Sequence, residues 1–142
     1  MKKSDILKSW TVLVVDDELD SREVACRILK FYGAQVSEAA DGLQALARLE
    51  TVKPNLIISD ISMPNLDGWG LVYELNQDRA TADIPVIALT AHAIAGDRER
   101  AFAAGFHNYL TKPLTPATFL QDLLRVVMDV PELAVSGIEV GA

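Results

Sequence analysis

Several apolar runs in this sequence end at residues that can do chemistry. Each run is followed, directly or after one residue, by a charged or hydroxyl side chain: Asp16 and Asp17 after residues 12–15, Asp60 after 56–58, Thr90 after 86–89, and Lys112 after 109–110. Crowded carboxylates repel one another unless a cation joins them, and such oxygen ligands favour Mg²⁺. A lysine and a hydroxyl beside them suit a phosphoryl group, which a carboxylate can accept as an aspartyl phosphate.

The same apolar runs predict the fold that would bring these residues together. Continuous Val, Ile and Leu runs are typical of parallel strands covered on both faces, and a weaker run occupies residues 35–37. Helical patterns lie between the runs, and five strand–helix units predict a doubly wound α/β sheet with its ligands at the carboxyl edge. The expected helix ends are N-caps at Asp41 and Thr115 (before Pro116), a helix start near Asp67, and C-terminal caps at Gly33 and Gly105.

Composition restricts the class of protein. The chain has 142 residues, a formal net charge of −7 and 50% hydrophobic residues, which predict one soluble domain. The pI near 4.7 argues against direct nucleic-acid binding, and no apolar stretch has the length of a membrane span. Cys26 is the single cysteine, so the chain can form no internal disulfide and a cytoplasmic location is expected. We expect an N-terminal extension over residues 1–10, the domain over 11–129 and a C-terminal tail over 130–142.

Four segments together resemble a known family. Val14-Val15-Asp16-Asp17, residues 59–68, Leu89-Thr90-Ala91 and residues 109–113 closely resemble the CheY-like receiver domain of bacterial two-component response regulators. The resemblance covers roughly residues 10 to 129. It implies a flavodoxin-like fold with five helices and a five-stranded sheet in the order 2-1-3-4-5. It also implies a signalling domain, not a separate enzyme, that accepts a phosphoryl group on one aspartate from a histidine kinase or a histidine phosphotransfer protein.

The resemblance further implies roles for individual residues. Asp60 would be the phosphoacceptor, and Mg²⁺ would be bound by Asp17, Asp60 and the backbone carbonyl of Ser62, with Asp16 acting through bound water. Around the phosphoryl group, the implied contacts are Lys112, the hydroxyl of Thr90 and the backbone N–H of Ala91.

Other implied roles concern signalling. Thr90 and Tyr109 would switch on phosphorylation and remodel the face formed by the fourth helix, fifth strand and fifth helix. That face would bind a downstream protein or a second copy of the chain. Ser62 and His92 would tune the lifetime of the phosphoryl group, and the Lys112–Pro113 peptide bond would be cis.

Two other functions are compatible with parts of the pattern. A Mg²⁺-dependent phosphohydrolase would also form an aspartyl phosphate, but such enzymes place a second aspartate where this chain has Ser62, and no cap insertion is present. A degenerate receiver acting only as an interaction module is disfavoured because every expected reactive residue is present. A flavin-binding module of the same fold is disfavoured by aspartates in the first loop, where a phosphate needs donors. A stand-alone regulator and a receiver from a hybrid kinase both fit the sequence.

Overall fold

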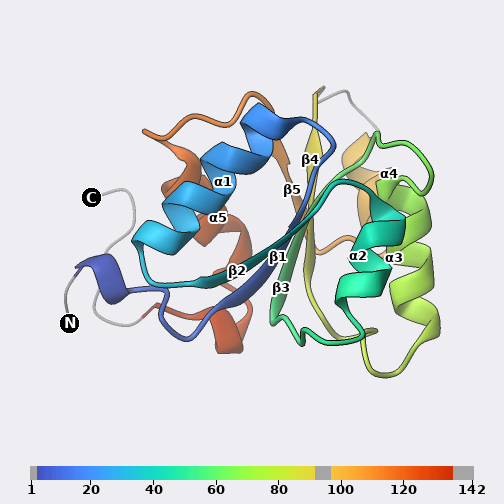
Figure 1. The fold of residues 1–142 in the computed structure, drawn as a ribbon, viewed down its shortest axis with the longest axis horizontal. Helices are drawn as coiled ribbons and strands as arrows, with labels where there is room; N and C mark the ends of the chain where they lie inside the picture. The colour runs from blue at the N-terminus through green and yellow to red at the C-terminus, as the bar shows by residue number, and fades with distance from the viewer. Residues whose placement is uncertain (1–2, 92–96, 136–142) are drawn as a thin grey trace.

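One parallel sheet forms the centre of the molecule. The computed structural model describes residues 3–91 and 97–135. Within them, the sheet has the order β2-β1-β3-β4-β5, with every neighbouring pair parallel, which confirms the predicted flavodoxin-like topology (Figure 1). The strands are β1 (Thr11–Val15), β2 (Gln35–Ala39), β3 (Leu56–Asp60), β4 (Val86–Thr90) and β5 (Asn108–Thr111).

Helices cover both faces of this sheet. α1 and α5 lie on one face, and α2, α3 and α4 lie on the other (Figure 1). The helices are α1 (Leu19–Phe31), α2 (Gly42–Arg48), α3 (Gly68–Gln77), α4 (Asp97–Ala104) and α5 (Phe119–Val127), with short 3-10 helices η1 (Lys3–Asp5) and η2 (Pro131–Leu133).

Strand β1 explains why the apolar runs are continuous. Val12 and Val14 pack in the cluster under α1 and α5, whereas Leu13 and Val15 pack in the cluster under α2 and α3. Successive side chains of a strand point to opposite faces, and both faces are buried here, so every position is apolar. The sheet is thereby buried between two layers of helices, and the residues at its carboxyl edge are positioned by this packing.

Most helix ends lie where the sequence predicts them. The carboxylates of Asp41 and Asp67 accept the backbone N–H groups of Gln44 and Gly70, each at 2.8 Å. This confirms the N-cap at Asp41 and the helix start near Asp67, which the structure shows to be an N-cap as well. Gly33 has a φ of 98° and follows α1, as the predicted C-terminal cap requires.

The predicted start of the last helix is wrong by three residues. α5 begins at Phe119 and not after Thr115. The hydroxyl of Thr115 is 2.7 Å from that of Thr118, so it bonds to a side chain and not to a backbone N–H of the first turn. Residues 116–118 consequently form a turn that leads into the helix.

The core extends beyond residues 11–129. Leu7 and Trp10 are 0% and 1% exposed, and Leu133 in η2 is 1% exposed. All three belong to the same buried cluster as α1 and α5, and the N–H of Leu7 donates to the carbonyl of Tyr32 at 2.8 Å. The flanking segments therefore contribute apolar packing to the domain. None of the helices within the described ranges combines the length and apolarity of a membrane span.

Candidate functional site

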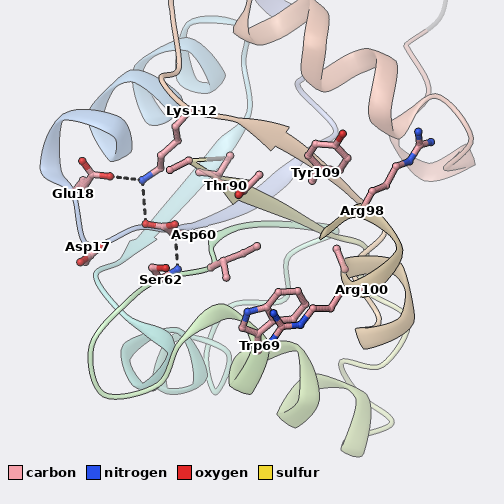
Figure 2. A pocket seen from close by; sticks show the side chains of 14 residues that line it. Asp17, Glu18, Asp60, Ser62, Trp69, Thr90, Arg98, Arg100, Tyr109 and Lys112 are labelled. Carbon is pink, nitrogen blue, oxygen red and sulfur yellow. Dashed lines mark hydrogen bonds and ion pairs between the residues drawn. The ribbon is translucent and has the colours of Figure 1, made fainter. Parts of the chain in front are cut away.

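The predicted reactive residues gather at the carboxyl edge of the sheet. Asp60 ends β3 opposite Leu89, and Thr90 ends β4 opposite Thr111. Asp16 continues the line of β1, because its N–H donates to the carbonyl of Ala39 at 3.0 Å. Parallel strands end at the same edge, so residues far apart in the sequence become neighbours here (Figure 2).

Three carboxylates form the acidic part of the site. One oxygen from each of Asp16, Asp17 and Asp60 lies within 4.8 Å of the others. Asp16 is 0% exposed and Asp60 is 6% exposed, whereas Asp17 is open to solvent. The Oδ1 atom of Asp16 accepts the N–H of Glu18 at 2.9 Å, whereas the buried Oδ2 atom accepts no hydrogen bond from the described residues. Closely spaced hard carboxylate oxygens suit a divalent cation.

Lys112 brings a positive charge into this cluster. Its Nζ atom donates to Oδ2 of Asp60 at 3.0 Å and to Oδ1 of Asp16 at 3.2 Å, and it lies 3.1 Å from Oδ2 of Asp16 as an ion pair. A third carboxylate, Glu18, is nearest to it at 2.6 Å (Figure 2). The lysine side chain is only 9% exposed, and the Lys112–Pro113 peptide bond is cis. One buried ammonium thus faces several carboxylates and only partly balances their charge.

The pKa values of the cluster reflect this imbalance. Burial raises the pKa of Asp60, and Asp16 raises it further, against the opposing effect of Lys112. Burial and the charge of Asp60 raise the pKa of Asp17. Burial alone would lower the pKa of Lys112, but the carboxylates of Glu18, Asp60 and Asp16 outweigh it and raise that pKa. The site therefore carries excess negative charge that a bound cation would offset.

A cavity of about 400 Å³ opens beside the cluster. Thr90, Ala91 and Tyr109 line it together with Asp17 and Asp60, and Tyr109 is partly buried. The remaining loop position, Ser62, donates its N–H to Oδ1 of Asp60 over a long 3.4 Å. His92 lies outside the described residues. Apart from Asp16, which is buried and contacts Lys112, the predicted site residues within the described ranges line one cavity.

Several residues of this site carry no predicted role. Glu18 directly follows the acidic pair Asp16-Asp17, and it is the nearest partner of Lys112. Arg98 and Arg100 line the cavity from α4, and the guanidinium of Arg100 lies 4.5 Å from the ring centroid of Trp69 (Figure 2). Glu18 could have been found from its place after the acidic pair, whereas the arginines depend on how α4 packs.

Comparisons with known proteins identify the family. The response regulator receiver domain family matches residues 12–124, and the chain belongs to this family. It is a receiver domain of two-component signalling, and its acidic pocket is compatible with a phosphoacceptor aspartate.

Its relatives differ in length. An uncharacterised 14.6 kDa protein of Leptolyngbya boryana is 39% identical over 85% of this chain and 89% of its own length. The phosphate regulon transcriptional regulatory protein PhoB of Escherichia coli is 35% identical over 87% of this chain but only 54% of its own length. The chain therefore spans about half of this longer relative.

Solved structures agree with the fold. The chemotaxis response regulator CheY4 of Vibrio cholerae is 32% identical, with a TM-score of 0.77 over 82% of this chain and 98% of its own. The receiver domain of the sensor histidine kinase PA1611 from Pseudomonas aeruginosa is 34% identical, with a TM-score of 0.72 over 83% and 97% of the two chains. That structure has a magnesium ion coordinated in its active site cleft. In the present chain, the clustered carboxylates suit a divalent metal.

Proposed function

We propose that this receiver domain accepts a phosphoryl group on Asp60 from a phosphohistidine partner and uses the modification to change its binding surface. The observation that carries the proposal is the surroundings of the Asp60 carboxylate. It lies within the acidic cluster, 3.0 Å from the ammonium of Lys112, and it borders an open cavity. A nucleophile for phosphoryl transfer needs both access and nearby positive charge.

The proposed reaction is a phosphoryl exchange. A carboxylate oxygen of Asp60 forms a bond to phosphorus while the P–N bond to the partner's imidazole breaks. The electron pair of that bond stays on the imidazole nitrogen, which takes up a proton. Lys112 is placed to hold a phosphoryl oxygen, since its ammonium already contacts Asp60. Thr90 and Ala91 line the same cavity, and we propose that the hydroxyl of Thr90 and the N–H of Ala91 hold another phosphoryl oxygen.

We assign the metal site to Mg²⁺. Asp17, Asp60 and the backbone carbonyl of Ser62 would bind it directly, and Asp16 would bind through water. The three clustered carboxylates, whose negative charge Lys112 only partly balances, support this choice. When bound, Mg²⁺ would neutralise charge that develops on the transferred group.

Signalling would follow from rearrangement around the cavity. Thr90 would move toward the phosphoryl group, and Tyr109, now partly buried, would follow and change the face formed by α4, β5 and α5. We propose that this face binds a downstream protein or a second copy of the chain. The donor would be a histidine kinase or a histidine phosphotransfer protein in the cytoplasm. The activity on the domain's own aspartate would be limited to phosphorylation and its reversal, with Ser62 and His92 influencing the rate of that reversal.

The test is intact mass measurement after incubation with acetyl phosphate and Mg²⁺. We expect a gain of about 80 Da in the wild type, and no gain with EDTA or in Asp60→Asn. Asp67→Asn is the matched control, because Asp67 lies in the same region but caps α3 through Gly70, so this variant should still gain the mass.

Two results would contradict the proposal. An unchanged gain in Asp60→Asn would place the modification elsewhere. If neither acetyl phosphate nor a phosphohistidine donor added mass to the wild type, the domain would instead act as an interaction module without phosphorylation.

A further inference from the structure

A side-chain hydrogen bond ties the loop after β3 to the start of α2. The amide Nδ2 of Asn65 donates to Oδ2 of Asp41 at 2.8 Å, while the other oxygen of Asp41 accepts the N–H of Gln44 at 2.8 Å. The Asp41 residue is only 6% exposed. Both of its carboxylate oxygens are therefore engaged, one by its own helix and one by the loop. The partial positive charge at the N-terminus of α2 also stabilises the ionised carboxylate of Asp41.

A second contact beside it is equally close. The N–H of Gly42 donates to the carbonyl of Leu66 at 2.9 Å. A Cβ atom added to Gly42 would lie 2.6 Å from that carbonyl oxygen, so α2 and the loop approach each other as only glycine allows. The side-chain bond and this backbone bond together fasten residues 65 and 66 to α2.

The backbone at Asn65 needs such support. Within the described ranges, Asn65 is the one non-glycine residue with a positive φ, which is 69°. The N–H of Leu66 donates to the carbonyl of Pro64 at 2.8 Å, which closes a three-residue turn around Asn65. A left-handed residue in a turn of this kind is strained and persists only when its surroundings hold it. The bond to Asp41 is a direct means of holding it.

This turn lies close to the proposed reaction centre. Only Met63 and Pro64 separate the turn residue from Ser62, and the N–H of Ser62 points to Asp60 over a long 3.4 Å. At its other end the loop is tied by the N–H of Gly68, which donates to the carbonyl of Ile61 at 2.9 Å. Ser62 lies between Ile61, which is bonded to Gly68, and Asn65, which is bonded to Asp41. A shift of residue 65 would therefore turn the backbone carbonyl of Ser62.

We infer that Asp41 and Asn65 are a positioning pair that sets the backbone of Ser62 for metal binding. The pair acts through the loop and touches neither the metal nor the phosphoryl group. This inference rests on the proposed function, because it assigns the Ser62 carbonyl to the metal. The alternative is that the hydrogen bond only stabilises the fold, in which case its loss would leave metal affinity unchanged.

Exchanging the aspartate and the asparagine of this pair distinguishes a positioning role from a purely structural role. In Asp41→Asn the single side-chain oxygen can serve either Gln44 or Asn65, and in Asn65→Asp two carboxylates face each other. In the double variant Asp41→Asn/Asn65→Asp, the new asparagine can cap Gln44 with its oxygen and donate its amide to the new aspartate. The swap thus restores the hydrogen bond with donor and acceptor exchanged.

The measurement is Mg²⁺ affinity by titration calorimetry, with metal-free unfolding followed in parallel. We expect each single variant to bind Mg²⁺ about tenfold more weakly and the swap to recover most of that loss. Asn65→Gly is a second variant that adopts the positive φ without strain but lacks the amide, and it should also bind more weakly. Asp67→Asn is the control for charge and capping and should bind as the wild type does.

The outcomes distinguish this inference from the proposed function. Single variants that unfold more easily but bind Mg²⁺ as tightly as the wild type would overturn the positioning role. A folded double variant that recovers no affinity would also overturn it. A wild type that binds no Mg²⁺ would instead overturn the metal site of the proposed function.

Discussion

Replacing Asp17 with asparagine should change the stability of the domain in opposite directions without and with Mg²⁺. Burial and Asp60 raise the pKa of Asp17 in the folded chain above its ordinary value. Above that raised pKa, the ionised carboxylate therefore destabilises the folded state relative to the unfolded state. The penalty disappears as the pH falls below the ordinary pKa of an aspartate, where both states are protonated.

The magnitude follows from the distance between the charges. Two unit charges at 4.8 Å, the upper limit of the separations within this cluster, repel by about 0.9 kcal/mol at the dielectric constant of water and about 3.5 kcal/mol at an effective value of 20. Because Asp17 is exposed, solvent screening places the effect near the lower limit. We expect Asp17→Asn to stabilise the metal-free domain by about 1 kcal/mol, or a rise in Tm of about 3 °C.

Mg²⁺ should reverse this order. At a concentration about 100 times its Kd, a bound ligand stabilises the wild type by about 2.7 kcal/mol. If loss of a direct ligand weakens binding about 100-fold, the same concentration stabilises the variant by only about 0.4 kcal/mol. The difference of about 2.3 kcal/mol exceeds the metal-free gain, so the wild type should become more stable by about 1.3 kcal/mol.

The assay is urea unfolding at neutral pH in EDTA and in MgCl₂, repeated near pH 3 in EDTA. The variant's advantage in EDTA should shrink at the acidic pH. Asp67→Asn serves as the control, since it removes a charge outside the cluster and keeps a capping side chain. Lower stability of Asp17→Asn in EDTA, or an equal gain from Mg²⁺ in variant and wild type, would refute the reasoning.

Two further changes test the charge balance and the extent of the core. Lys112→Met leaves the buried carboxylates of Asp16 and Asp60 without their cation, so unfolding free energy at neutral pH should fall by about 3 kcal/mol or more; a loss below about 1 kcal/mol would contradict this. Leu7→Ala removes a side chain with no exposed surface and should cost about 2–5 kcal/mol in urea unfolding. A negligible loss would mean that the N-terminal segment packs only loosely.

Much of the fold could be predicted because it depends on local pattern. Continuous apolar runs indicate strands buried on both faces, and Asp41 and Asp67 cap their helices through groups three residues away. The start of α5 was predicted less well, because the hydroxyl of Thr115 has a competing partner in Thr118. That competition depends on how the turn folds.

Some features of the site could likewise be predicted from the sequence, whereas others depend on how distant segments pack. The types and order of the strand-end residues identify Asp16, Asp17, Asp60, Thr90 and Lys112 as candidates, since parallel strands must end at one edge. The bond between Asp41 and Asn65 joins two loops 24 positions apart, and no periodicity or cap signal relates such residues. The same holds for Arg100 over Trp69, which requires α4 to pack beside α3.

Residue types and their spacing therefore predicted the succession of strands and helices, the chemical character of the site and the resemblance to receivers. The distances and the charge balance follow from how the chain folds. The structure shows that Lys112 is nearest to Glu18, that Oδ2 of Asp16 is buried with no hydrogen bond from the described residues, and that Leu7 lies in the core. The sequence gives the type of each residue, but burial and pairing arise only when separate segments pack together and exclude water. Burial and pairing in turn set the pKa values of the site and its affinity for a cation.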